Sequence, residues 1–222
     1  MGFGRMILKT TSGYKERTKV SGTDPTLVGS STAANLSTTG MTVLSGVSGI
    51  DDGNGLIPVS FPFYFFGTDY GSNLNKVFWC TNSVIHFNTG NSTIGWTATT
   101  GRGILLGNAD RRTNTIYYSS AQTSGSFQYI NLELYGQNIY SDGVANAIKW
   151  QMRMVRGTSF QYIELRANTA PSTAGTWNIT NGTTFQNTFT GFTNVTAGSS
   201  FVLRSDLQGN NWTLFNNNSL PF

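Results

Sequence analysis

With 222 residues, the chain is long enough for one large domain with its own core, or for one domain and an arm. Only 11% of the residues are charged, against about 25% in typical soluble domains, and 26 are glycine, so turns and uncharged polar surfaces are expected to dominate. The net charge of +4 comes from few acids and scattered basic residues, which argues against nucleic acid as a partner.

Residues 1–45 hold few large apolar side chains and are predicted to form an extended N-terminal arm. Ordering such a chain costs about 1–2 kcal/mol per residue, so we expect contacts with another subunit to compensate, and the arm to act as an assembly device in a homo-oligomer. The alternative is an arm that packs on its own domain. The predicted contacts are four apolar anchors and four basic side chains that would pair with acidic surface: Phe3, Met6, Ile7, Leu8, Lys9, Lys15, Arg17 and Lys19.

Two features follow in the next segment, an acidic turn and an aromatic run. In IDDGNGL (50–56), Asp51, Asp52 and Asn54 offer oxygen ligands, but the third acidic position and the closing Glu of a Ca²⁺ loop are missing, so we favour a turn and expect no metal. The run PVSFPFYFFGTDY (58–70) fits either a buried strand or an exposed platform for a sugar or a membrane. Burial is favoured because contiguous apolar patches are rare on soluble surfaces.

The only histidine and the only cysteine of the chain fall in one predicted strand, VFWCTNSVIHF (77–87). Zinc is excluded because there are too few ligands, and one cysteine cannot form an intrachain disulfide. Neither a nucleophile-elbow motif nor a phosphate-binding glycine loop occurs. We therefore expect His86 and Cys80 to be structural, and the protein to be no enzyme and to use no cofactor.

The remaining strands alternate apolar and polar side chains with a period of two. AIKWQMRMVR (147–156) and FQYIELRA (160–167) are separated by a short glycine-containing turn and predict a β-hairpin of half-buried strands. No window has a sustained helical period, so residues 46–222 are predicted to form one antiparallel β-sandwich. Its expected core includes Phe63, Phe65, Trp150, Met152 and Ile163.

A longer packing pattern runs through residues 56–87. It consists of Phe61, Pro62, Phe63, Phe65, Phe66, Gly67 and Tyr70, followed by Thr81, Asn82, Ile85 and Phe87. This pattern resembles nidogen-like β domains, in which LPFPFxFFGxxY precedes VxVxTNGxIxF, and the likeness covers about residues 50–170. The chain departs from it at Ser83, where the pattern has glycine, and at a missing tryptophan. The resemblance implies a sandwich of nidogen-like or jelly-roll type and says little about chemistry.

Two function classes fit these observations. The first is a structural protein of a tailed-bacteriophage virion, a capsid decoration, tail or fibre protein that binds other virion proteins, because charge is low and an arm precedes a β domain. The second is a carbohydrate-binding or adhesive module in which Trp96 or Trp177 stacks on a host-surface glycan. No signal peptide and no apolar run of about 20 residues are found, so we expect synthesis in the host cytoplasm and no membrane association.

Overall fold

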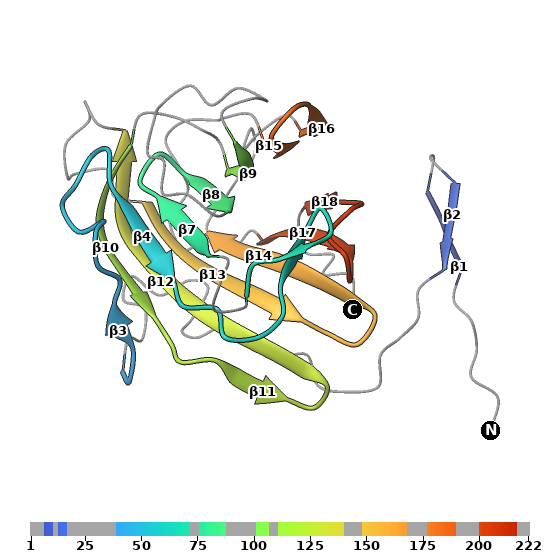
Figure 1. The fold of residues 1–222 in the computed structure, drawn as a ribbon, viewed down its shortest axis with the longest axis horizontal. Coiled ribbons are helices and arrows are strands. Elements are labelled where there is room, and N and C mark those ends of the chain that lie inside the picture. Colours follow the sequence, from blue (N-terminus) through green and yellow to red (C-terminus); the bar gives the residue numbers. More distant parts are fainter. Residues whose placement is uncertain are drawn as a thin grey trace.

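The structure is a computed structural model in which every regular element of the described residues is a β-strand. The described residues are 7–10, 13–16, 39–71, 76–87, 101–106, 111–139, 148–167, 177–189 and 200–216. Two large antiparallel sheets account for most of them, and Figure 1 shows the strands of the larger sheet as one long curved layer. The predicted all-β architecture is confirmed, and within the described segments there is no helix that could cross a membrane.

The larger sheet has eight strands. In spatial order these are β18 (Thr213–Asn216), β17 (Ser200–Asp206), β14 (Phe160–Ala167), β13 (Ile148–Arg156), β12 (Phe127–Ile139), β10 (Arg111–Tyr118) and β3 (Thr42–Val43), and β11 (Gln122–Ser124) also pairs with β12. The strands β13 and β14 form the predicted hairpin, in which Met154 lies opposite Ile163.

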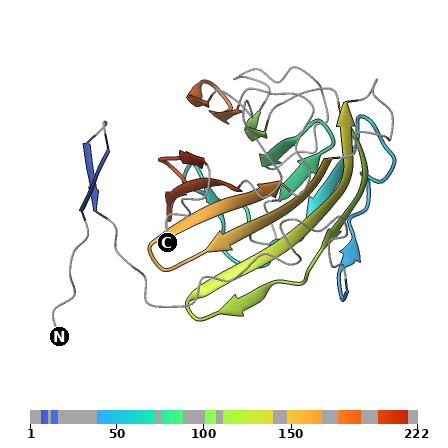
Figure 2. The same ribbon diagram turned by 180° about the vertical axis from the view of Figure 1, so that it is seen from behind.

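The second sheet has six strands. Their order is β16 (Phe185–Phe189), β15 (Trp177–Asn181), β9 (Arg102–Leu106), β8 (Val84–Phe87), β7 (Val77–Cys80) and β4 (Asn54–Ile57). Two small hairpins complete the described strands: β5 (Tyr64–Phe65) with β6 (Thr68–Asp69), and β1 (Ile7–Thr10) with β2 (Gly13–Glu16). In Figures 1 and 2, β1 and β2 lie apart from the two large sheets.

One apolar core joins the facing sides of the two large sheets. The larger sheet contributes Ile116, Ile130, Leu132, Leu134, Met152, Met154, Ile163, Leu165 and Leu203; the smaller one contributes Ile57, Val77, Trp79, Ile85, Phe87, Ile104, Leu106 and Ile179. The predicted core positions Phe63, Phe65, Met152 and Ile163 are fully buried, which confirms them. The side chain of Trp150 lies outside the described residues.

The aromatic run at 58–70 is part of this core rather than an exposed platform. Phe61, Phe63 and Phe65 are buried, and the ring of Phe65 stacks on Phe87 with 4.0 Å between centroids. Trp212, just before β18, also packs on the Phe65 ring, with 5.6 Å between centroids. The rings therefore close the space between the sheets, next to the turn that joins β17 to β18.

The sandwich begins before residue 46. Thr42 and Val43 pair with β10, and Leu44 and Val47 are buried in the core. The sandwich domain therefore starts before residue 46, N-terminal to the expected boundary. The few apolar side chains here, Met41, Val43, Leu44 and Val47, lie among glycine, serine and threonine without a sustained period of two, which is why the sequence did not predict this short edge strand.

The expectation that the hairpin strands are half-buried is wrong. The alternation holds, because Met152 and Met154 face the core while Gln151 and Arg153 point to the other side of the sheet. Yet Gln151 and Arg153 are also fully buried. We call the side of each sheet that faces away from the other sheet its outer face; in β13 both the inner and the outer side chains are removed from solvent.

Candidate functional site

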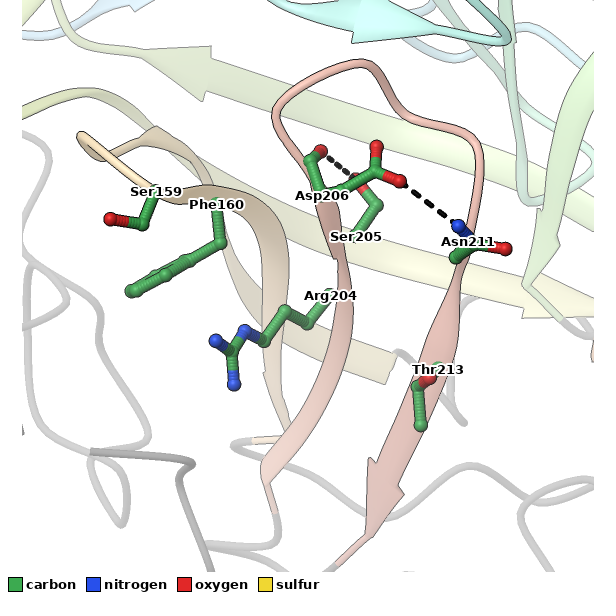
Figure 3. A pocket seen from close by; sticks show the side chains of 7 residues that line it. All are labelled: Ser159, Phe160, Arg204, Ser205, Asp206, Asn211 and Thr213. Carbon is green, nitrogen blue, oxygen red and sulfur yellow. Dashed lines mark hydrogen bonds between the residues drawn. The ribbon is translucent and has the colours of Figure 1, made fainter. Parts of the chain in front are cut away.

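A pocket of about 300 Å³ opens where β14, β17 and β18 lie side by side (Figure 3). It is lined by Ser159, Phe160, Arg204, Ser205, Asp206, Asn211 and Thr213. These residues combine a cation, a carboxylate, hydroxyl groups and an amide in one hollow. Such a set can bind a small polar ligand, because it offers both hydrogen-bond donors and acceptors.

The alternation of β17 selects which side chains reach the pocket. Arg204 and Asp206 lie on the outer face, whereas Ser205 points to the inner side and is buried. The Ser205 hydroxyl donates to the carbonyl of Asp206 at 3.0 Å and accepts from Gln161 Nε2 at 3.2 Å. Ser205 therefore holds the end of the strand in place beneath the two charged side chains.

The guanidinium of Arg204 lies over the ring of Phe160, with 4.3 Å from Cζ to the ring centroid. Phe160 is itself buried in a small apolar cluster on the outer face with Phe127, Val155, Tyr162 and Val202. A planar guanidinium that rests on a fixed ring keeps its N–H groups in one plane. The stack therefore fixes the orientation of a hydrogen-bond donor at the pocket.

The carboxylate of Asp206 organises the turn between β17 and β18. Its Oδ1 accepts from the backbone N–H groups of Gln208 and Asn210, and its Oδ2 accepts from Asn211 Nδ2, each at 3.0 Å. At Gly209, φ is +67°, and a Cβ atom there would lie 2.2 Å from the carbonyl oxygen of Tyr64. The turn therefore requires glycine at this position and holds Asp206 and Asn211 in one arrangement.

The aromatic run at 58–70 is hydrogen-bonded to this turn. The N–H groups of Phe66 and Gly67 donate to the carbonyls of Gly209 and Gln208 at 3.1 and 2.9 Å. Trp212 Nε1 donates to the Gly209 carbonyl at 2.8 Å. The pocket is thus built on the rigid core through a backbone contact between two segments that are far apart in the sequence.

Arg156 ties the hairpin strand β13 to the same turn. Its Nη1 donates to the Leu207 carbonyl at 2.6 Å, and its guanidinium lies 5.0 Å from the ring centroid of Tyr64. Burial lowers the pKa of Arg156, and the nearby Tyr64 and Asp69 oppose that change. The turn is therefore held from both sides by a cation and by the aromatic run.

A second polar cluster, which we call the outer row, lies on the outer face of β12, β13 and β14. It consists of Asn131, Glu133, Gln151, Arg153 and Glu164, all buried. Gln151 Nε2 donates to Glu133 Oε1 at 3.3 Å, and Arg153 Nε donates to Asn131 Oδ1 at 3.1 Å. Arg153 Nη1 also lies 3.8 Å from Glu164 Oε2. Burial raises the pKa of Glu133 to about 9, so this carboxyl is neutral at pH 7.

The acidic turn at 50–56 is held by hydrogen bonds, as expected of a turn. We call the side chains of Thr81 and Asn82, with their partners, the Asn82 clamp. Asn82 Nδ2 donates to Asp52 Oδ1 at 3.0 Å, and Asn82 Oδ1 accepts from the backbone N–H of Arg111 at 2.8 Å. Thr81 Oγ1 donates to the Asp51 carbonyl and accepts from the N–H of Gly53. Among the described residues, no group of three or more His, Cys, Asp or Glu could hold a metal ion.

His86 and Cys80 are both buried on the outer face of the smaller sheet. The imidazole of His86 stacks on Phe78 at 5.6 Å, and Cys80 packs with Val84 and Leu105. Burial agrees with the structural roles expected for them. A buried thiol among aliphatic side chains is a weak nucleophile, because thiolate formation needs solvent or a nearby cation.

Only some of the site residues expected from the sequence lie within the described segments. Ile7, Leu8, Lys9 and Lys15 lie in β1 and β2, whereas Phe3, Met6, Arg17 and Lys19 lie outside the described residues. Trp96 also lies outside them, as does the side chain of Trp177, whose backbone is in β15.

The pocket was not predicted, because its residues come from separate segments without a common motif. One signal was available: in SSFVLRSD (199–206), Arg204 and Asp206 are two residues apart, so a strand over this segment would place both side chains on one face. Comparison with protein families, characterised proteins and solved structures finds no significant match to this chain.

Proposed function

We propose that the protein is a structural component of a tailed-bacteriophage particle, either a capsid decoration protein or a tail or fibre protein, and that it acts through protein–protein contacts. Its partners would be other virion proteins and further copies of this chain. It would be made in the host cytoplasm and reside in the virion. The observation that carries the proposal is the hairpin of β1 and β2.

This hairpin pairs with no other strand of the described chain. A two-stranded hairpin alone is at best marginally stable in water, because it buries little apolar surface. Each of its outer edges presents unpaired backbone groups that can extend a sheet of another subunit. The sequence ILKTTSGYKE carries Lys9 and Lys15 against one acidic residue, Glu16, so an acidic surface on the partner that met the two lysines would strengthen the contact.

The edge of the sandwich at β3 and β4 supports the same proposal. Three apolar side chains in or next to these edge strands are exposed. They are Val43, Ile50 and Leu56, with exposed fractions of 48%, 43% and 41%. Exposed apolar side chains beside an open strand edge favour association with another chain. The exposed Asp52 lies between Ile50 and Leu56 in the sequence, and its carboxylate, which also accepts from Asn82, would suit the lysines of the hairpin.

We also propose that the sandwich is of nidogen-like type. The turn after β7 supports this, because Ser83 has φ of +60° at the position where the nidogen-like pattern has glycine. Glycine is the residue that adopts this conformation without steric cost. The Thr81 and Asn82 side chains of the pattern have a packing role here, since both are buried in the clamp.

A carbohydrate-binding or adhesive module is the second candidate function, and the pocket beside Arg204 favours it. The pocket offers the donors and acceptors that sugar hydroxyls need. An adhesin of a phage tail would combine both functions, with a host-surface glycan as the ligand.

Deleting residues 2–38 tests the assembly proposal and leaves the described sandwich intact. We expect the full chain to form homo-oligomers or regular particles, visible by light scattering and electron microscopy, and the truncated chain to be a folded monomer. A chain with Lys9→Glu and Lys15→Glu should assemble more weakly than the wild type at low salt. Normal assembly by the truncated chain, or a monomeric full chain, would refute the proposal.

A further inference from the structure

The pocket of Figure 3 places a cation and a carboxylate on the same face of one strand. Arg204 and Asp206 are two residues apart in β17, and both line the pocket. Their formal charges cancel, and a ligand carboxylate or phosphate would meet the Asp206 carboxylate as well as the guanidinium. The pocket therefore suits an uncharged ligand that both donates and accepts hydrogen bonds.

The Asp206 carboxylate is already held in one orientation before a ligand binds. A carboxylate has about four acceptor positions, and three of them are used by Gln208 N, Asn210 N and Asn211 Nδ2. These bonds hold the side chain in one orientation and leave room for one further donor. Because the group is already ordered, binding requires little loss of side-chain freedom.

The other lining groups extend this pattern. Ser159 and Thr213 carry hydroxyls that donate and accept, and Asn211 Oδ1 is an amide acceptor on the side of Asn211 that faces away from the Asp206 carboxylate. A volume of about 300 Å³ is at the small end for ligand pockets, which limits the occupant to about one sugar ring. The Phe160 ring is buried beneath Arg204 and offers no open stacking face, so binding through this pocket alone is weak.

We infer that this pocket binds one ring of a neutral saccharide through its hydroxyl groups, one accepting from Arg204 and another donating to Asp206. Thr213 and Asn211 contact the remaining hydroxyls. The inference rests on the second function proposed above, and it assigns that function to residues other than Trp96 and Trp177.

The test is an NMR titration of the ¹⁵N-labelled full chain. The probes are the methyl glycosides of glucose, galactose and mannose, with glucuronic acid and inorganic phosphate as anionic probes, each to about 50 mM because millimolar dissociation constants are expected. At least one neutral glycoside should shift the Arg204 Nε–H and Asn211 Nδ2–H signals in a saturable way. Both anions should give smaller shifts at equal concentration.

Three variants locate the binding, and one controls for charge. Arg204→Gln and Asp206→Asn should weaken binding about tenfold or more, and Thr213→Val, which leaves the turn bonds of Asp206 in place, should weaken it about threefold. Arg112→Gln makes the same charge change at an exposed position of β10 and should leave binding unchanged.

The inference is wrong if no neutral glycoside shifts these signals, or if glucuronate or phosphate binds more tightly. It is also wrong if binding persists unchanged in Arg204→Gln and Thr213→Val; carbohydrate binding would then stand, with its site elsewhere. None of these outcomes bears on assembly through the N-terminal hairpin, which the deletion of residues 2–38 tests separately.

Discussion

The Asn82 clamp and the outer row are both buried polar clusters, but they differ in how their hydrogen bonds are completed. In the clamp, Asn82 uses its amide as donor and acceptor at once, to Asp52 and to the Arg111 backbone. In the outer row, Glu133 Oε2 and Gln151 Oε1 have no hydrogen-bond partner within the part of the chain that the structure describes.

This difference separates two effects of burying a polar group. A buried group whose hydrogen bonds are complete stabilises the one arrangement that completes them. A buried group that lacks a partner lowers the stability of the folded state, because it has lost its water. The clamp is therefore expected to hold the fold together, whereas the outer row makes stability depend on pH.

The largest expected effect is on the pH dependence of stability. The pKa of Glu133 is raised to about 9 in the folded chain, from about 4.5. Below pH 4.5 the carboxyl is neutral in the folded and the unfolded chain, so its full contribution to the free energy of unfolding is present there. Between pH 4.5 and 9 only the unfolded chain ionises, and the free energy of unfolding falls by at most about 1.4 kcal/mol per pH unit. Glu133→Gln cannot ionise and should lose this slope.

Urea unfolding of both proteins from pH 5.5 to 8.5 measures this effect. The difference between their free energies of unfolding cancels the other titrating groups. We expect Glu133→Gln to gain stability relative to the wild type at each higher pH. Parallel pH profiles would mean that Glu133 is ionised in the folded chain and that its burial has little effect on its pKa.

Breaking the Asn82 clamp should have the next largest effect. Asn82→Ala leaves the buried N–H of Arg111 without its acceptor and removes the bond to Asp52, so we expect a loss of about 1–3 kcal/mol by urea unfolding. Asn210→Ala, at an exposed position in the turn after β17, is the matched control and should change stability by less than about 0.5 kcal/mol. Equal losses in the two variants would remove the distinction between clamp and surface.

Replacing Glu133 and Gln151 by apolar side chains tests whether the incomplete hydrogen bonds of the outer row lower the stability of the fold. The double variant Glu133→Leu, Gln151→Leu removes both buried groups together, so at pH 7 we expect between no change and a gain of about 2 kcal/mol. Glu133→Leu alone leaves Gln151 Nε2 without its acceptor and should be less stable than the double variant. A loss above about 1 kcal/mol in the double variant would show that the outer row is needed for folding.

The sequence predicts the inner face of the sandwich well and the outer face poorly. Alternation in the hairpin at 147–167 identifies Met152 and Ile163 as core, because period two determines which side chains share a face. It cannot show that Gln151 and Arg153 are buried, since that depends on what covers the sheet. The pocket was missed for a related reason: Phe160 and Arg204 meet only because β14 pairs with β17, and no local motif encodes that pairing.

The smallest expected effect concerns the one residue at which the chain departs from the nidogen-like pattern within the clamp turn. Ser83 has φ of +60°, which costs an L-residue about 1–2 kcal/mol, while glycine there loses about 0.5–1 kcal/mol more chain entropy on folding. The backbone bonds of the turn, from Ser83 N to the Cys80 carbonyl and from Leu106 N to the Ser83 carbonyl, are unaffected by the side chain. Ser83→Gly should therefore gain about 0.5 kcal/mol, a rise in melting temperature of about 1–2 °C. Ser83→Ala keeps the Cβ atom and should show no gain; if it stabilises as much as Ser83→Gly, the benefit comes from removing a buried hydroxyl and not from relief of backbone strain.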